Sequence, residues 1–351
     1  SPSQKLAALA RLQRSVRAAQ LGELEQRQII EGRVDTSNAD KDFDPRPYLN
    51  ASKEVRDRIV ETDLPRNPTP LASEDGNPML RDWLGDWVGT FLGHKGAVWC
   101  ARLSGDNGAA RAVSGSADFS AKVWDTYTGE CLQTIGHGHI VRSVAIDRAG
   151  ASVLTGGHER TLRLFDLARE PRVESAAVFG RGAESHATPI RSVVQSWADE
   201  RVVATAEDRA VHWWDVRTLA RVHSLAVDEP IVSMERSTGA FGEYLALASG
   251  RHALFVDLRT HEVVRRHALD VQPSCVSLHP TGARFVAGCV DDEWVRVYDA
   301  DGTQLDVHKG HHGPVHCVSY TPDGQVAASG SEDGTIRLWQ NTPGTKYGLW
   351  A

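Results

Sequence analysis

Short runs of apolar and β-branched residues, separated by turns rich in Gly, Asp and Ser, follow one another along most of the chain. One such series comprises residues 98–103, 110–114, 121–124 and 130–134. Runs of this length and composition, bounded by turn residues, predict β-strands. The series therefore predicts a small antiparallel sheet of four strands.

The same unit recurs along the chain. In three copies an Asp lies six residues before a Trp, namely Asp118 and Trp124, Asp208 and Trp214, and Asp333 and Trp339. The predicted third strand of each copy ends 41 to 49 positions after the previous one, in the series Asp82, Asp125, Asp166, Asp215, Asp257, Asp299 and Gln340. A period in this range, with one sheet per repeat, indicates a β-propeller. We therefore expect an all-β, seven-bladed propeller.

A His, a hydroxyl residue, an acid and a Trp recur together in these units. We predict that the turn acid binds the His, that the His binds a Ser or Thr, and that this hydroxyl accepts from the Trp indole. Such a network would satisfy polar groups buried between sheets. We assign to it His94, Asp118, Trp124, Asp208, Trp214, His311, Asp333 and Trp339. The third and sixth units should carry weaker versions, and the fifth none.

The same residue types also suggest catalysis or metal binding. Ser, His and Asp form hydrolase triads, but this set recurs from unit to unit whereas catalysis needs one site. A metal site is suggested by His308, His311, His312 and His316, yet no carboxylate or Cys lies at ligand spacing on the same predicted element. No glycine-rich phosphate loop is found. We therefore expect a non-enzyme without metal or cofactor.

Composition narrows the class of protein further. Apolar residues make up 41% of the chain and there are 31 glycines, which suits a turn-rich β protein with a substantial core. The net charge of −7 argues against a general nucleic-acid binder. The apolar runs are far shorter than a membrane span. Five cysteines lack CxxC spacing, and we expect them to be reduced and buried.

Residues 1–69 form a separate N-terminal arm in this interpretation, and residues 70–351 form the propeller. The arm has no repeat signal and contains a block of prolines. Residues 4–30 have the apolar spacing of a thin amphipathic helix, and a second short helix is expected from Asn50. The first propeller unit is incomplete, because no convincing innermost strand precedes the strand predicted at 87–92.

Basic residues near the start of the arm suggest a contact with partner proteins or RNA. Arg11, Arg14 and Arg17 fall in a stretch of 20 residues without an acid. The arm would become ordered on its partner. A processed import sequence is the alternative, and it would place the protein in an organelle such as the mitochondrion.

Two features of the fourth unit suggest further contacts. The sequence Trp214-Asp215-Val216-Arg217 fits the WDxR box by which substrate receptors dock onto cullin-type ubiquitin ligases. The plainer interpretation is a third strand followed by a solvent-facing Arg217. Trp213 should point to the opposite face of its strand from Trp214. It would be a partner contact if exposed, or packing between blades if buried.

Several segments resemble the serine-threonine kinase receptor-associated protein family of WD-repeat propellers. These segments are residues 75–81, 85–99, 117–125, 276–280, 331–340 and 346–350. The resemblance covers roughly residues 70–351, and the arm lies outside it. It implies a seven-bladed, non-enzymatic scaffold linked to the SMN complex, to an RNA-binding partner in translation control and to receptor-kinase signalling. The i subunit of translation initiation factor 3 is similar more distantly.

These observations predict a non-catalytic interaction scaffold within a multisubunit, ribonucleoprotein-related complex. The expected partners are other proteins of that complex, with RNA contacted through the arm or indirectly, and with neither membrane insertion nor a small-molecule substrate. The expected location is the cytoplasm, and also the nucleus. A structural subunit of an organellar assembly and a ubiquitin-ligase substrate receptor remain as alternatives.

Overall fold

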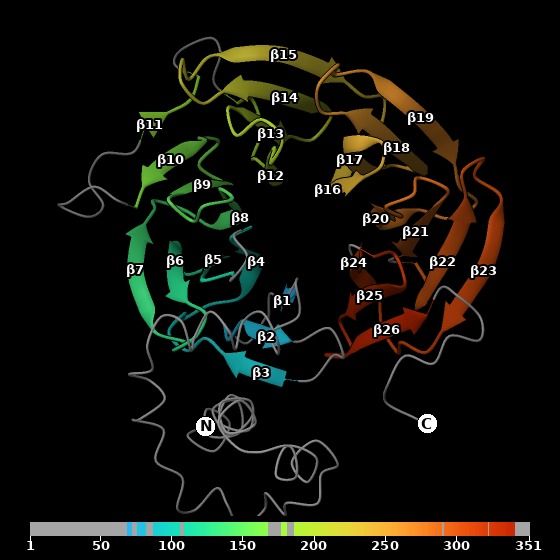
Figure 1. Ribbon diagram of the computed structural model, residues 1–351, viewed down its shortest axis with the longest axis horizontal. Coiled ribbons are helices and arrows are strands. Elements are labelled where there is room, and N and C mark those ends of the chain that lie inside the picture. The colour runs from blue at the N-terminus through green and yellow to red at the C-terminus, as the bar shows by residue number, and fades with distance from the viewer. Residues whose placement is uncertain are drawn as a thin grey trace, which may run out of the picture.

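The computed structural model describes residues 69–71, 76–81, 87–105, 109–167, 177–180, 186–289, 291–321 and 323–340. Within these ranges the chain forms seven antiparallel sheets arranged in a ring around a central axis (Figure 1). We call these sheets units 1 to 7 in chain order. The prediction of an all-β, seven-bladed propeller is confirmed.

Units 1 to 4 occupy the first part of the ring. Unit 1 has three described strands, β1 (Thr69–Leu71), β2 (Met79–Arg81) and β3 (Trp87–Thr90). Unit 2 comprises β4 (Val98–Leu103), β5 (Arg111–Ser116), β6 (Ser120–Asp125) and β7 (Cys131–Gly136). Unit 3 comprises β8 (Val141–Ile146), β9 (Ser152–Gly157), β10 (Arg163–Asp166) and β11 (Ala177–Val178). Unit 4 comprises β12 (Ser192–Gln195), β13 (Val202–Ala206), β14 (Ala210–Asp215) and β15 (Arg221–Ala226).

Units 5 to 7 complete the ring. Unit 5 comprises β16 (Ile231–Gly239), β17 (Gly242–Ser249), β18 (His252–Asp257) and β19 (Val263–Ala268). Unit 6 comprises β20 (Pro273–Leu278), β21 (Arg284–Cys289), β22 (Trp294–Asp299) and β23 (Gln304–Lys309). Unit 7 has three described strands, β24 (Val315–Tyr320), β25 (Val326–Ser331) and β26 (Ile336–Gln340).

Each unit is a meander in which every strand pairs with the next one along the chain. The expected ends of the third strands agree with β6, β10, β14, β18, β22 and β26. The strand predicted at 87–92 belongs to the first unit, because β3 pairs with β2. The strand β1 lies against β4. It pairs with β2, which ends just before Asp82, the expected end of a third strand, so β1 takes the place of a second strand. Unit 1 has no innermost strand among its described residues.

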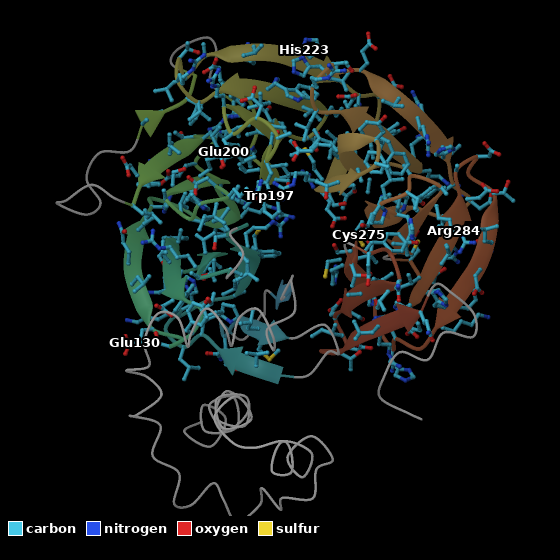
Figure 2. The ribbon with its side chains drawn as sticks, in the orientation of Figure 1. Glu130, Trp197, Glu200, His223, Cys275 and Arg284 are labelled. Atoms are coloured by element: carbon cyan, nitrogen blue, oxygen red, sulfur yellow. The ribbon has the colours of Figure 1, made fainter. Side chains whose placement is uncertain are left out.

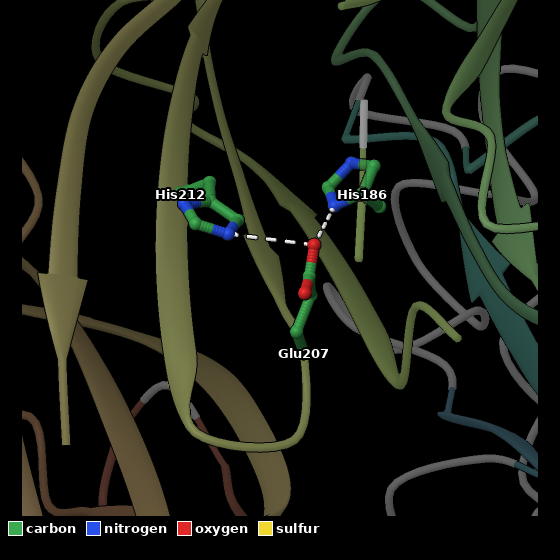
Figure 3. Close-up of side chains that lie close together, drawn as sticks. All are labelled: His186, Glu207 and His212. Carbon is green, nitrogen blue, oxygen red and sulfur yellow. Dashed lines mark hydrogen bonds and ion pairs between the residues drawn. The ribbon is translucent and has the colours of Figure 1, made fainter. Parts of the chain in front are cut away.

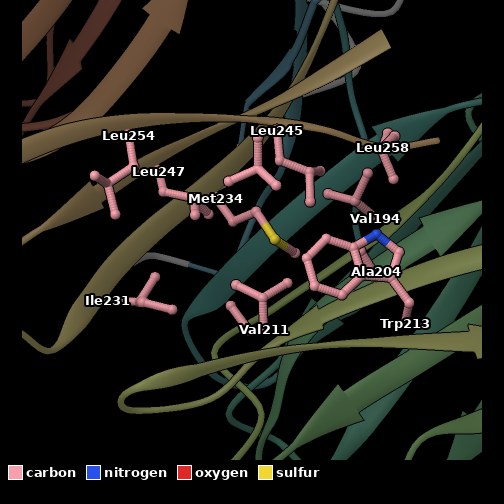
Figure 4. Packing of buried hydrophobic residues seen from close by; sticks show 12 residues of the cluster. Val194, Ala204, Val211, Trp213, Ile231, Met234, Leu245, Leu247, Leu254 and Leu258 are labelled. Carbon is pink, nitrogen blue, oxygen red and sulfur yellow. The ribbon is translucent and has the colours of Figure 1, made fainter. Parts of the chain in front are cut away.

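The hydrophobic core lies between neighbouring sheets. One cluster joins units 4 and 5 through Trp213, Met234 and Leu247 (Figure 4), and the other clusters join successive sheets in the same way. In Figure 2, Trp197 lies at the inner margin of the ring and His223 at the outer margin. Because each sheet buries its apolar faces against its neighbours, the units depend on one another for stability.

The prediction of a separate, partly helical N-terminal arm is not tested by this architecture. The arm at residues 1–69 lies almost wholly outside the described residues, and so do its expected helices. The described part of the chain has no helix of the length and apolar character that a membrane span needs.

Candidate functional site

Unit 2 contains a closed network of four side chains. The Trp124 indole N–H donates to Ser114 Oγ over 2.8 Å, and Ser114 Oγ lies 2.7 Å from His94 Nε2. His94 Nδ1 lies 2.8 Å from Asp118 Oδ2. Since the Ser oxygen accepts from Trp124, its hydroxyl hydrogen is free to donate to His94, whose Nδ1–H then donates to Asp118. Every polar atom in this chain of contacts has a partner.

The charge state of the network follows from its surroundings. Burial lowers the pKa of His94 and keeps its ring neutral. Burial alone would raise the pKa of Asp118. Hydrogen bonds from Ser120, from the Lys95 backbone N–H and from His94 outweigh it and lower the pKa to about 2. The network therefore holds a carboxylate against a neutral imidazole.

Unit 7 repeats this arrangement. Trp339 Nε1 donates to Ser329 Oγ over 2.7 Å, His311 Nε2 lies 2.7 Å from the same oxygen, and His311 Nδ1 lies 3.1 Å from Asp333 Oδ2. Asp333 also accepts from the His312 backbone N–H over 2.9 Å. These donors outweigh burial and lower the pKa of Asp333. The acid thus fixes the loop that enters the blade.

Unit 4 has the network, but Asp208 does not take the place predicted for it. The buried acid is Glu207, whose Oε1 lies 2.5 Å from His186 Nδ1 (Figure 3). The Trp214 indole N–H donates to Thr205 Oγ1 over 2.9 Å. Asp208 is partly exposed and pairs with Arg191 over 3.2 Å.

The length of a hairpin explains this difference. The hydroxyl residue precedes the Trp by ten positions in units 2 and 7 but by nine in unit 4. The turn between β13 and β14 is therefore one residue shorter, and Glu207 lies where unit 2 has Ser116. The longer Glu side chain reaches the His from this position. Counting from the hydroxyl to the Trp, rather than from the acid, would have revealed the change.

The fourth unit also brings a second histidine to the acid. His212 Nε2 lies 3.4 Å from Glu207 Oε1, and Ser224 Oγ lies 2.7 Å from His212 Nδ1. The ligand atoms of His186, Glu207 and His212 lie within 4.8 Å of one another, and all three residues are buried. Two imidazoles and a carboxylate could hold a zinc ion. Sequence analysis missed this group, because its residues come from a loop, a turn and a strand.

Proton-mediated contacts account for this group better than a metal does. The contact between His186 Nδ1 and Glu207 Oε1 is short even for a hydrogen bond, whereas ligands about 2.0 Å from a tetrahedral zinc lie well over 3 Å apart. The residue two positions before the Trp is His212 in unit 4, but it is Lys122 in unit 2 and Arg337 in unit 7. Burial would raise the pKa of Glu207, but hydrogen bonds from both histidines lower it.

The four histidines near the start of unit 7 are not brought together as ligands. His311 is held in its network, and the His308 ring stacks on Trp339 with centroids 5.0 Å apart. His312 and His316 are exposed. Units 3 and 6 have reduced networks. In unit 3, His137 Nε2 lies 2.9 Å from Thr155 Oγ1, and in unit 6 Asp292 pairs with Arg296 over 2.5 Å.

Comparison with known proteins agrees with these repeated networks. The family described as "WD domain, G-beta repeat" matches residues 85–125, 129–166 and 302–340. The chain is 41% identical over 280 residues to the serine-threonine kinase receptor-associated protein of Gallus gallus, which covers 80% of this chain and 77% of that relative. The protein of the same name in Dictyostelium discoideum is 40% identical over 271 residues, or 76% of this chain and 88% of the relative.

The chain belongs to the serine-threonine kinase receptor-associated protein family. More distantly, it is 23% identical over 329 residues to the eukaryotic translation initiation factor 3 subunit I of Danio rerio, covering 80% of this chain and 92% of that protein. The resemblance inferred from the sequence is confirmed. The chain is a WD-repeat protein of a scaffold family whose members bind other proteins.

Trp213 is not available to a partner of this WD-repeat scaffold. Its side chain is fully buried between units 4 and 5 (Figure 4). Alternation along β14 points Trp213 and Trp214 to opposite faces, and a neighbouring sheet covers each face. Trp213 therefore packs between blades and is not a partner contact.

Arg217 is exposed, but the acid before it has a local task. Asp215 Oδ1 accepts from the backbone N–H groups of Arg217 over 2.7 Å and Thr218 over 3.2 Å. Asp257 accepts in the same way from the backbone of Arg259 over 2.7 Å. The acid of the WDxR box therefore caps a turn. Arg11, Arg14 and Arg17 lie outside the described residues.

The described inner strands hold other titratable groups. Burial raises the pKa of Glu235 to about 7, although Ser319 Oγ donates to its Oε1 over 2.6 Å. Burial also raises the pKa of the Cys275 thiol. Thiols without a lowered pKa are poor nucleophiles. All five cysteines are free, and Cys131 and Cys317 are exposed rather than buried as expected.

Proposed function

We propose that the chain is a non-catalytic scaffold that holds proteins together in a multisubunit, ribonucleoprotein-related complex. The observation that supports this proposal is that the recurring sets of a His, an acid and a hydroxyl residue have a structural role. In units 2, 4 and 7 each set lies under a Trp and fixes a loop to a sheet. These residue types, which form active sites in hydrolases, are here consumed in building the ring.

The relatives support a role within an assembly. One is named as associated with a kinase receptor and another as a subunit of a translation initiation factor. We infer that this chain has the same kind of place, in SMN-type ribonucleoprotein assembly or in translation. Its partners would be other proteins, met in the cytoplasm and also in the nucleus. The arm at residues 1–69 would add RNA or protein contacts through Arg11, Arg14 and Arg17.

Affinity purification of the tagged full-length chain from its native source, followed by mass spectrometry, tests this function. We expect a defined set of proteins in fixed proportions that includes ribonucleoprotein or translation components. The triple variant Arg11→Glu, Arg14→Glu and Arg17→Glu should no longer co-purify with RNA, while its propeller stays folded. Recovery of the chain without any stoichiometric protein would contradict the scaffold role. Organellar components in the same material would favour an organellar assembly.

A substrate-receptor role is kept as a second candidate because the Arg217 side chain is exposed beside a capped turn. The residues at 256–259 form an equivalent turn with Arg259 exposed, and they provide a matched control. If this role holds, Arg217→Ala should abolish binding to a purified cullin adaptor and Arg259→Ala should not. Equal binding by both variants, or none by the wild type, excludes the WDxR interpretation.

A further inference from the structure

The innermost strands of five units share a β-bulge at the same point. The register between the first and second strands shifts between Val98 and Cys100 in unit 2 and between Val141 and Ser143 in unit 3, and units 5, 6 and 7 repeat it. A bulge leaves one residue out of the pairing and re-aims its side chain. The residues set free in this way are Trp99, Arg142, Val232, Ser274 and His316.

Two of these bulge residues meet at the edge of units 2 and 3. Trp99 is 48% exposed, although its neighbours Val98 and Cys100 are buried. The Arg142 guanidinium lies over the Trp99 ring, 5.1 Å from its centroid. An indole exposed to this degree adds little to the core, so the fold does not explain why a Trp is present here.

Arg142 also lines an open depression of about 290 Å³, together with His158, Thr188, Pro189, Arg191 and Asp208. Arg191 pairs with Asp208 over 3.2 Å. Glu159, the residue after His158, pairs with Arg163 over 2.6 Å. Within the described residues no ion pair includes Arg142, and burial together with nearby Arg191 lowers its pKa. The depression therefore offers one guanidinium, that of Arg142, which has no carboxylate partner among the described residues.

Phe119 extends this surface. It follows Asp118 in a tight turn with a φ of 64°, and Gly334 has a φ of 75° after Asp333 in unit 7. A bulky residue is strained in this left-handed conformation, yet Phe119 is 45% exposed. Its ring lies 5.4 Å from that of His139, which stacks on His158 at 5.0 Å. The Phe119 ring is therefore an exposed aromatic group that the turn itself does not require.

These side chains form a continuous aromatic–cationic strip consisting of Phe119, His139, His158, Arg142 and Trp99. We propose that the strip binds an acidic peptide segment of a partner protein. Arg142 receives a carboxylate or a phosphate group of the peptide, and the rings of Trp99 and Phe119 receive its apolar side chains. This inference rests on the proposed scaffold function and assigns it a surface and a ligand chemistry.

A peptide suits the strip better than RNA does. Nucleic acid binding draws on several cations that neutralise successive phosphates. The strip has one uncompensated guanidinium, and the acids Asp118, Glu159 and Asp208 border it. The net charge of −7 opposes a polyanion further. A short peptide with one or two anionic groups avoids this repulsion.

Selection from a displayed random-peptide library against the full-length chain tests the proposal. We expect the selected peptides to carry one or two Asp or Glu residues next to aromatic or aliphatic residues. Fluorescence anisotropy with the best peptide should show that Arg142→Ala and Trp99→Ala each weaken binding about tenfold. Lys309→Ala is the matched control, because Lys309 lies 3.9 Å over the Trp294 ring on the outer part of unit 6. It should leave the affinity unchanged.

Phe119→Gly is a second variant that should fold normally, because glycine suits the left-handed conformation of the turn. Thermal unfolding should show that its propeller is as stable as that of the wild type. This variant should also bind the peptide more weakly. Replacing the peptide's Asp by phosphoserine separates a phosphate ligand from a carboxylate ligand. The proposal is overturned if the selected peptides are not acidic, if Arg142→Ala binds them as the wild type does, or if polyuridylate binds in preference. Complexes purified with intact composition would leave the scaffold function standing in each of these cases.

Discussion

Units 2 and 4 meet the same requirement with different residues. Each buries a Trp whose indole needs an acceptor and a His whose ring needs an acid. Unit 2 uses Ser114 and Asp118, and unit 4 uses Thr205 and Glu207. The shorter hairpin of unit 4 moves the acid to another register position, and a longer side chain restores its reach. The ring therefore conserves hydrogen bonding rather than sequence spacing.

The two networks are not equally complete. His94 has a partner on both ring nitrogens in unit 2. In unit 4, His186 Nε2 is buried without a hydrogen-bond partner among the described residues, and Glu207 serves two histidines and Thr188. The acid of unit 4 thus carries more of the local stability. The four predictions below test this difference, from the largest expected effect to the smallest.

Glu207→Ala should be the most damaging change. It leaves His186, His212 and the Thr188 hydroxyl without their acceptor inside the protein, which should lower the free energy of unfolding by about 2–3 kcal/mol. Urea denaturation followed by tryptophan fluorescence measures this. A loss smaller than that of Asp118→Ala would show that the acid of unit 2, not that of unit 4, carries the greater share.

Asp118→Asn should change the pH dependence of stability. The pKa of Asp118 falls from 3.8 to about 2 on folding, so the ionised acid stabilises the fold above its ordinary pKa. This contribution is lost as the pH falls from 3.8 towards 2. Thermal unfolding across this range should therefore be steeper in pH for the wild type than for the Asn variant. If the unfolding temperatures of the wild type and the Asn variant change in parallel with pH, ionised Asp118 does not stabilise the network.

Asp208→Ala should have little effect, within about 0.5 kcal/mol, because its pair with Arg191 is near the surface. This substitution is also the control for Glu207→Ala, since the two acids are adjacent in one turn. A loss comparable to that of Glu207→Ala would mean that the spacing to Trp214, rather than the hairpin register, identifies the acid correctly.

Zinc should not stabilise the wild type. Hydrogen bonds already satisfy Glu207, and the 2.5 Å contact with His186 leaves no room for an ion between them. Differential scanning fluorimetry with added zinc should give the same shift for the wild type and for His212→Ala. A shift confined to the wild type would identify the three residues as a metal site.

Sequence reasoning succeeded where period and residue type act together. The recurring spacing from Asp118 to Trp124 and from Asp333 to Trp339 reflects one hairpin geometry. It predicted the ring and the residues of two networks, those of units 2 and 7. It failed at Asp208 because a one-residue change in turn length does not alter the residue types around it. It could not find His212 or the strip, because these depend on which turns and strands of neighbouring sheets come together.

The bulge in the innermost strands separates residues that pack the blade from residues that face outwards. Buried neighbours such as Val98 and Cys100 fit the sheet packing, whereas Trp99 lies outside the pairing and is half-exposed. Exposed bulge residues can therefore be exchanged without repacking a blade. A library varied at Trp99, Arg142, Val232 and His316 would turn this natural ring into a starting point for engineered binding proteins.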